Sequence, residues 1–181
     1  MKLTLDKMVI RSAKEEDATI LVDWLNDGTI MKNFGFPHGT GITLEGVLAK
    51  INNKNDYHEV LILEIDNHIV GDMTYDIDKK DATISIKICD ASFRYEGYGT
   101  IFIQMIISYL FSIGVNNIYC NVYLDNNIAS HVLEKVGFEK LRINFNDLEN
   151  QNGVLKSTLD FVMTKERYEF MYLGEDTNIE S

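Results

Sequence analysis

The spacing of apolar and polar residues divides the chain into short strands and amphipathic helices. Seven short runs are rich in β-branched and aliphatic residues, which is typical of strands. They cover residues 9–11, 60–64, 69–75, 83–89, 117–123, 141–145 and 155–163. Four longer segments carry apolar residues at helical spacing. They cover residues 14–25, 43–52, 101–113 and 127–136. The predicted order is one strand, two helices, three strands, a helix, a strand, a helix and two strands.

Turn residues indicate how these elements connect. Residues 66–67, Asp-Asn, lie between two strand runs and predict a hairpin, and residues 150–153, Asn-Gln-Asn-Gly, predict another near the C-terminus. Asn126 and Gly137 are a suitable N-cap and a suitable stop for the helix between them. Residues 31–41 are rich in aromatic residues and glycine, and we expect a loop there.

Length and composition favour one cytoplasmic domain. A chain of 181 residues can build one hydrophobic core, which we assign to residues 1–173, and the acidic, polar residues 174–181 are an expected frayed tail. We find no apolar run long enough to span a membrane and no apolar signal segment at the N-terminus. Cys89 and Cys120 fall in predicted strands, which indicates reduced core thiols in the cytoplasm.

The formal net charge of −11 argues against a nucleic-acid partner, because nucleic acids are bound by clustered Lys and Arg. The same charge is compatible with a cationic amine as substrate, since an acidic surface attracts cations. Acidic charge that only keeps the protein soluble is the simpler alternative.

The most informative segment joins strand run 83–89 to the helix that follows. Residues 94–100 read Arg-Tyr-Glu-Gly-Tyr-Gly-Thr, so two glycines precede the helix. Such a turn directs several backbone N–H groups at one point, at the positive end of the helix dipole, where a phosphate binds well. The segment lacks the Lys of a P-loop, and Phe102 replaces the third glycine of a dinucleotide fingerprint. An ordinary turn that binds nothing is the alternative.

Arg-x-x-Gly-x-Gly at a strand-to-helix junction resembles the pyrophosphate loop of the GNAT acetyltransferase superfamily. Residues 126–138 resemble the family's second signature, Asn-x-x-Ala/Ser followed by a helix that ends in Glu-Lys-x-Gly-Phe. Both signatures occur in the family's order. The resemblance implies an α/β (α+β) fold, a single GNAT-like domain with a mixed, mostly antiparallel sheet flanked by helices. Two central strands splay apart to admit the coenzyme, and the glycine loop follows the fourth strand.

The resemblance also implies an enzyme that moves an acetyl group from acetyl-CoA to a primary amine by direct attack in a ternary complex, without a metal. In the family the N–H groups of the glycine loop hold the pyrophosphate, and the preceding strand pairs with the pantetheine arm. The N–H of Ile88 would face the thioester oxygen as oxyanion donor. The implied coenzyme-binding residues are Lys87, Ile88, Cys89, Arg94, Tyr95, Glu96, Gly97, Tyr98, Gly99, Thr100 and Asn126.

The residues that move protons are less clearly marked, because the chain departs from the family pattern. Leu133 stands where many relatives have a Tyr that protonates the departing thiolate, and Ala129 stands where others have a Ser. Ser130 and His131 are the nearest candidate catalytic side chains, and water is another proton donor. The candidate proton acceptors are Asp72, Tyr75, Ser85, Asn121 and Tyr123.

We expect the acceptor pocket between residues 31–41 and the terminal hairpin. Its candidate substrate-binding residues are Trp24, Phe34, Phe36, His38 and Tyr75. The pattern is similar to the branch that contains ribosomal-protein N-terminal, polyamine and aminoglycoside 6'-N acetyltransferases. The expected acceptor is a small cationic amine or a peptide N-terminus, with no nucleic acid or membrane as partner. Dimers are common in such families, so a homodimer is a further expectation. The alternative, suggested by Leu133 and Ala129, is a non-catalytic acyl-CoA sensor.

Overall fold

The computed structural model describes residues 1–174, and its centre is one eight-stranded sheet with the order β1-β2-β3-β4-β5-β6-β8-β7. The parallel pairing of β5 with β6 is the exception in an otherwise antiparallel sheet. The strands are β1 (Lys2–Leu5), β2 (Met8–Ser12), β3 (His58–Ile65), β4 (His68–Asp78), β5 (Asp81–Ile88), β6 (Asn117–Tyr123), β7 (Glu139–Glu149) and β8 (Leu155–Thr164).

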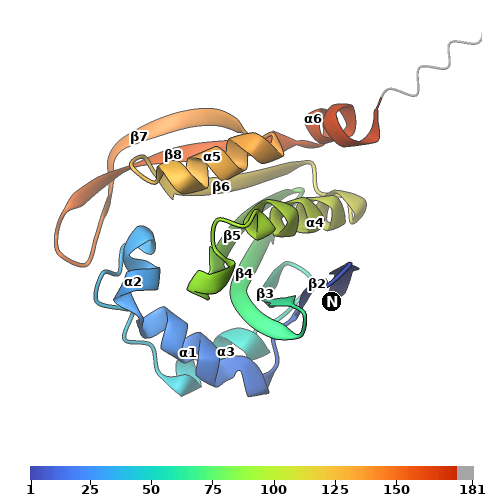
Figure 1. Cartoon of the computed structure of the whole chain (residues 1–181). Coiled ribbons are helices and arrows are strands. Elements are labelled where there is room, and N and C mark those ends of the chain that lie inside the picture. The colour runs from blue at the N-terminus through green and yellow to red at the C-terminus, as the bar shows by residue number, and fades with distance from the viewer. Residues whose placement is uncertain (175–181) are drawn as a thin grey trace, which may run out of the picture.

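Helices cover both faces of this sheet (Figure 1). One face carries η1 (Glu15–Asp17), α1 (Ala18–Asn26), α2 (Gly28–Met31), η2 (Lys32–Phe34) and α3 (Leu44–Asn52), and we call it the α1 face. The other carries α4 (Tyr98–Ser112) and α5 (Asn127–Val136), and we call it the α4 face. The short turn η3 (Ala91–Phe93) precedes α4, while α6 (Lys165–Tyr168) and the π-helical turn η4 (Glu169–Leu173) follow β8.

Alternating side chains in each strand sort into two hydrophobic clusters. The larger lies under α4 and α5 and includes Ala82 and Ile84 of β5 and Ile118 and Cys120 of β6. The smaller lies under α1 and α3 and includes Ile62 of β3. Because successive side chains of a strand point to opposite faces, the residues between these core positions lie on the α1 face of β5 and β6.

The central strands β5 and β6 diverge. They share three register pairs, Asp81–Asn117, Ala82–Ile118 and Thr83–Tyr119, although each strand continues well beyond them. The remaining halves of the two strands therefore border an open gap, as predicted from the family resemblance.

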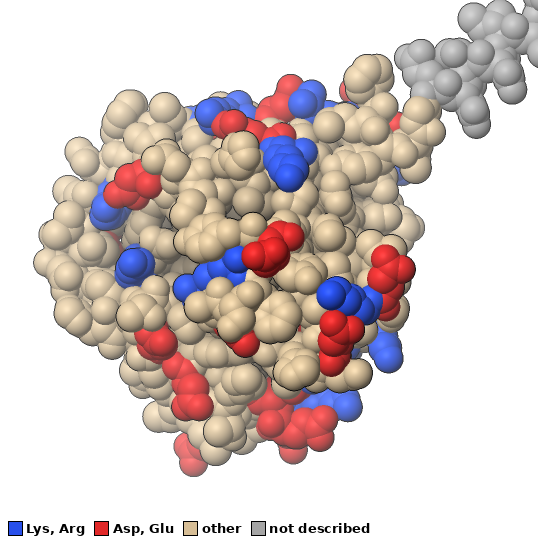
Figure 2. Space-filling view, in the orientation of Figure 1, with Lys and Arg blue, Asp and Glu red and all other residues tan. Residues whose placement is uncertain are grey.

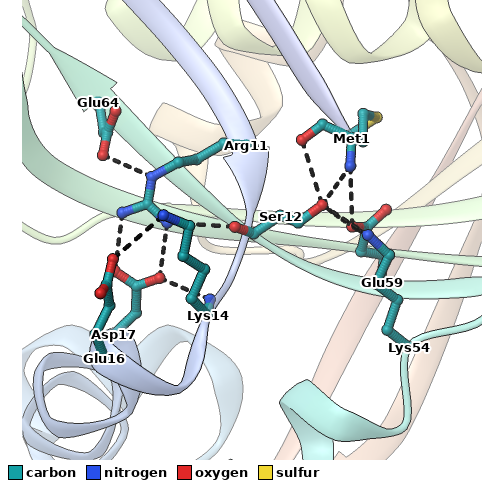
Figure 3. Close-up of polar contacts among 9 residues, drawn as sticks. All are labelled: Met1, Arg11, Ser12, Lys14, Glu16, Asp17, Lys54, Glu59 and Glu64. Carbon is teal, nitrogen blue, oxygen red and sulfur yellow. Dashed lines mark hydrogen bonds and ion pairs between the residues drawn. The ribbon is translucent and has the colours of Figure 1, made fainter.

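A polar network fastens β2 to its neighbours (Figure 3). Arg11 binds both carboxylate oxygens of Asp17 at 2.7 and 2.8 Å and also the carboxylate of Glu64 at 2.7 Å. At the end of the strand, Ser12 donates to Glu59, which also accepts from Lys54 at 2.6 Å. The Arg11 contacts hold η1 against β2 and β3, and the Glu59 contacts tie the end of β2 and the residues after α3 to β3.

The structure confirms the predicted strands and helices and corrects several details. β1 and the helices α6 and η4 are additional elements, so the glycine loop follows the fifth strand and not the fourth. Residues 31–41 are not wholly a loop, since α2 and η2 cover its beginning; Asp27 caps α2 by accepting from the N–H of Thr29. Most of the predicted tail, residues 175–181, lies outside the described residues.

Candidate active site

The glycine loop presents an unusual run of free backbone donors. Tyr95 and Gly97 have left-handed backbones, with φ of 66° and 85°, and α4 begins directly after them at Tyr98. Among the described residues, the six N–H groups of residues 95–100 donate to no other backbone group. The last three belong to the first turn of α4, where a helix has no internal partner for them. The loop is therefore an anion-binding concavity at a helix N-terminus.

The space in front of this loop fits a diphosphate. A Cβ built on Gly97 would meet no atom within 4 Å, and one on Gly99 would meet Ile88 Cγ1 at 3.9 Å. The side chain of Tyr95 is 82% exposed and Glu96 is exposed too, so these residues offer their main chain. The residues present thus fit the pyrophosphate of coenzyme A.

Arg94 anchors the loop to the end of β5. Its Nε donates to the carbonyl of Ile88 at 2.8 Å and its Nη2 to the carbonyl of Cys89 at 2.7 Å. These contacts fix the angle between the strand and the loop. Its observed contacts are therefore positional, and direct binding of a phosphate by Arg94 stays a prediction.

The backbone of β5 turns free polar groups toward the gap. The N–H of Cys89 donates to Val70 of β4 at 2.8 Å, and the carbonyl of Lys87 also points to β4, since it lies 2.0 Å from a Cβ built on Gly71. N–H and C=O groups of successive strand residues point to opposite sides. Those of Ile86 and Ile88 therefore point away from β4, toward the gap. The carbonyl of Ile88 already accepts from Arg94, so the N–H groups of both residues remain for the pantetheine arm and a thioester oxygen.

A buried ion pair lies on the α1 face of β5. Lys87 Nζ is 2.8 Å from Asp72 Oδ2, and both side chains are less than a tenth exposed. The ring of Phe34 lies 5.1 Å from the same ammonium group. Burial, and next the charge of Asp72, raise the pKa of the neighbouring Cys89 thiol. Cys89 is thus a core thiol and no nucleophile, and Asp72 is bound to Lys87 rather than free to accept a proton.

The two segments predicted to border the acceptor pocket are far apart in sequence but in contact in the structure. The N–H of Gln151 donates to the carbonyl of Gly35, and its side chain bonds the N–H of His38 and the carbonyl of Gly39. His38 Nε2 also lies 2.7 Å from Asn152 Oδ1. The tip of the β7–β8 hairpin therefore rests on residues 35–39, at the edge of the gap.

The predicted substrate residues divide into two groups. Phe34 and Phe36 are 39% and 40% exposed beside this junction, and His38 is exposed as well. Trp24 is half-buried against the α1–α3 cluster. The prediction for Tyr75 is wrong, because Tyr75 is 3% exposed in the α4-face core and donates its hydroxyl to Glu59 at 3.1 Å.

Helix α5 offers few catalytic groups. The side chain of Asn126 accepts from the N–H of Ala129 at 3.2 Å, so its capping role is present. Leu133 is buried in the core, and Ser130 is half-buried at the flank of that buried side. His131 is exposed and stands about 160° around the helix from Leu133, with 100° per residue. His131 therefore faces away from the sheet, which argues against its predicted catalytic role.

The remaining proton-acceptor candidates lie on the α1 face. Ser85 is half-buried on the β5 side of the gap. Tyr123 of β6 is buried, and that burial raises the pKa of its phenol, so the phenol keeps its proton at neutral pH and is not available as a base. Asn121 donates to Asp160 at 2.6 Å.

Asp160 is a functional candidate that the sequence analysis missed. Burial alone would raise the pKa of this carboxylate, but hydrogen bonds from Asn144, Asn121 and Arg142 outweigh it and lower the pKa. Arg142 Nη2 lies 3.0 Å from Asp160 Oδ2. The alternation along β8 could have placed Asp160 on a polar face, but only the strand register brings it beside Asn121.

Charges of both signs are interspersed over the face seen in Figure 2, with no large patch of either sign. Within residues 1–174, no three or more His, Cys, Asp and Glu side chains are grouped to hold a metal ion. Nor is any helix in this range long and apolar enough to cross a membrane.

Solved structures share this fold at low sequence identity. A spermidine N-acetyltransferase from Vibrio cholerae in complex with CoA and spermine superposes with a TM-score of 0.81 and 16% identity, over 91% of this chain and 99% of that one. A ribosomal L7/L12 alpha-N-protein acetyltransferase in complex with coenzyme A gives 0.80 and 14%, over 91% and 98%. Aminoglycoside acetyltransferase AAC(6')-Ib in complex with coenzyme A gives 0.71 and 20%, over 91% and 98%.

Comparison with curated protein sequences gives no match. The family model of the acetyltransferase (GNAT) domain, however, matches residues 10–155, which is most of the chain. The free donors of the glycine loop, the gap between β5 and β6 and this match agree, and the chain belongs to the GNAT acetyltransferase family.

Proposed function

We propose that this protein transfers an acetyl group from acetyl-CoA to a primary amine by direct attack in a ternary complex. The observation that carries the proposal is the run of six free N–H groups at residues 95–100, placed at the open end of the gap between β5 and β6. A diphosphate on the loop directs the rest of the coenzyme along the free edge of β5. The thioester then reaches the α1 face, where the acceptor enters.

The backbone of β5 supplies the electrostatic part of the chemistry. As the amine attacks, negative charge develops on the thioester oxygen, and the N–H of Ile88 points into the gap to stabilise it. A preorganised donor of this kind contributes about 3 kcal/mol or more of transition-state stabilisation. Collapse of the tetrahedral intermediate expels the thiolate, which takes a proton from water or from a hydroxyl such as that of Ser130.

The amine must lose its proton before it attacks. A lysine-like ammonium has a pKa of about 10.4, so deprotonation at pH 7 costs roughly 4.6 kcal/mol. We assign this step to water held by polar groups of the α1 face near the gap, of which Ser85 and Asn121 are the nearest candidates. Holding both reactants in line offsets several kcal/mol of the barrier.

The acceptor class is a small cationic amine or the N-terminus of a peptide. Three structures that share the fold are described as acting on spermidine, on ribosomal L7/L12 protein and on aminoglycosides. The exposed Phe34 and Phe36 at the rim supply apolar surface for either class of acceptor.

The test combines a titration of the protein with acetyl-CoA and an assay of free-thiol release with a panel of amines. Gly97→Glu should weaken acetyl-CoA binding by at least about tenfold, because it puts a carboxylate where the pyrophosphate binds and costs at least about 1.4 kcal/mol. Gly114→Glu is the matched control, because Gly114 also has a left-handed backbone and open space around it but follows the far end of α4.

If both variants bind acetyl-CoA as the unaltered protein does, the loop is an ordinary turn and the proposal fails. Binding without thiol release from any amine would instead support the sensor alternative.

A further inference from the structure

A cavity of about 270 Å³ lies on the α1 face at the closed end of the gap. Its polar lining comes from Thr83 of β5, Tyr119 and Asn121 of β6, Arg142 of β7 and Asp160 of β8. Thr83 and Tyr119 are the last residues that pair β5 with β6, so the cavity begins where the gap begins.

The cavity is separated from the reacting atoms by a defined length of strand. Thr83 precedes Ile86 by three residues and Ile88 by five, which corresponds to roughly 10 to 16 Å at about 3.3 Å per residue. An acceptor whose amine attacks near Ile88 therefore reaches the cavity only if it extends for about three to five residues of peptide, or an equal length of another chain.

The charges around this path are already balanced. Asp160 accepts hydrogen bonds from Asn121, Asn144 and Arg142, at 2.6, 3.0 and 3.0 Å. It is the carboxylate among the lining residues, and Arg142 is the cation among them. Closer to the reacting atoms, Asp72 is bound to Lys87. Neither of these two carboxylates is left to bind a second ammonium group of a substrate.

A polycation and a peptide would interact differently with the residues that line the cavity. The further ammonium groups of a polyamine or an aminoglycoside would find no unpaired carboxylate among the lining residues, because Asp160 already has Arg142 as its partner. A peptide brings carbonyl oxygens, which suit a guanidinium that has five N–H donors and is seen to give one of them to Asp160. Its side chain is 70% exposed, so the remaining donors are accessible.

We infer that the acceptor is the N-terminal α-amino group of an extended peptide, and that Arg142, held by Asp160, binds the peptide three to five residues after that amino group. The inference rests on the proposed function and names its substrate class. It also runs against the simplest interpretation of the net charge of −11, because the carboxylate that lines the cavity is already paired with Arg142.

The test measures thiol release at saturating acetyl-CoA. The acceptors are serine amide, peptide amides of two to six residues that begin with Ser and continue with Ala, the N-acetylated forms of all of these, spermidine and kanamycin. We expect kcat/KM to rise about tenfold or more between one and five residues, as a charge-assisted hydrogen bond is gained, and to level off afterwards. Spermidine and kanamycin should be poorer substrates than the pentapeptide, and the blocked peptides should release no thiol.

Two variants assign the effect to Arg142. Arg142→Gln should raise KM for the pentapeptide about tenfold, with kcat, acetyl-CoA affinity and the rate with the one-residue substrate unchanged. Lys140→Gln is the matched control, because it removes the same charge from the same strand, but Lys140 is paired with Glu134 of α5.

The outcomes separate this inference from the proposed function. Faster turnover of spermidine or kanamycin than of every peptide would overturn the inference and leave the acetyltransferase in place. An Arg142→Gln variant that loses no activity toward peptides would overturn it too. Absence of thiol release with every amine would refute the proposed function itself, and the inference with it.

Discussion

Asp17 is the residue on which the junction of β2 and the first helical turn depends. Burial alone would raise its pKa, but the hydrogen bonds from Arg11 and from the N–H of Lys14 outweigh burial and lower it. A carboxylate with a lowered folded-state pKa stabilises the fold above its unfolded pKa, about 3.9, and this stability is lost as pH falls through the folded pKa. We predict that Asp17→Asn lowers the free energy of unfolding at pH 7 by about 3 kcal/mol, since Arg11 keeps Glu64 as a partner.

Urea unfolding of both proteins between pH 7 and pH 2.5 checks this prediction. The difference between them should shrink as pH falls below about 4, because the carboxylate is protonated first in the unfolded chain and only at lower pH in the folded protein. Glu16→Gln is the control, because Glu16 lies in the same turn and pairs with Lys14 at the exposed surface, where loss of a pair costs at most about 1 kcal/mol. A difference that stays constant over the whole pH range would show that the charge of Asp17 is not the cause.

Single residues of the coenzyme site were easier to predict than those of the acceptor site. The coenzyme loop works through its main chain, and its glycines and their place before a helix are visible in the sequence. The proposed acceptor site depends on side chains that only the strand register brings together. Asp160 contacts Asn121, 39 residues away, and Asp72 lies opposite Lys87 on the adjacent strand. The sequence does not place Tyr75, because the alternation along β4 does not show whether its tyrosine lies on the α1 face or on the α4 face.

At the scale of elements, the β7–β8 hairpin docks on residues 35–39 and would border the mouth of the proposed acceptor site. We predict that Gln151→Ala raises the acceptor KM between about threefold and thirtyfold, because it removes two hydrogen bonds worth about 1 kcal/mol each. The acetyl-CoA titration should not change. Steady-state kinetics with a fixed acceptor measures both effects.

Gln104→Ala is the matched control for this prediction. Gln104 lies on α4 and its amide contacts Tyr172, so its loss should leave the acceptor KM unchanged. If Gln151→Ala weakens acetyl-CoA binding as much as acceptor binding, the hairpin supports the whole fold rather than the acceptor site.

The periodic elements followed from sequence, and the irregular ones did not. Strong apolar spacing located α3, α4 and α5 and the strands β2 to β8 within a few residues. The edge strand β1 was not predicted, because Lys2–Leu5 is short and mostly exposed and so shows little alternation of apolar and polar residues. Helix α2 was not predicted, because Gly28 and the aromatic segment after the helix have the composition of a loop. In the structure its N-cap, Asp27, and the docked hairpin hold it in place.

At the scale of the whole molecule, the sheet consists of two halves that are joined by three register pairs of β5 and β6. Each half has its own helix on the α4 face, α4 beside β5 and α5 beside β7. The β7–β8 hairpin, which contacts residues 35–39, joins the halves a second time, away from these pairs. Acetyl-CoA bound in the gap would contact both halves between these two junctions and add a third link. A ligand that binds only the folded state raises the free energy of unfolding by RT ln(1 + [L]/Kd), where [L] is the free ligand concentration. This is about 2.7 kcal/mol when [L] is a hundred times Kd.

Hydrogen exchange at single backbone amides tests whether the coenzyme binds along the free edge of β5. The N–H groups of Ile86 and Ile88 point into the gap, whereas that of Cys89 is already bonded to Val70. We predict that saturating acetyl-CoA slows exchange at Ile86 and Ile88 by up to about a hundredfold, because Ile86 becomes hydrogen-bonded to the pantetheine arm and Ile88 to the thioester oxygen. Exchange at Cys89 should change less, and exchange in β1, at the far edge of the sheet, least. If Ile86 and Ile88 are already as protected as Cys89 without coenzyme, the edge of β5 is not free in solution, and the path proposed for the coenzyme is closed.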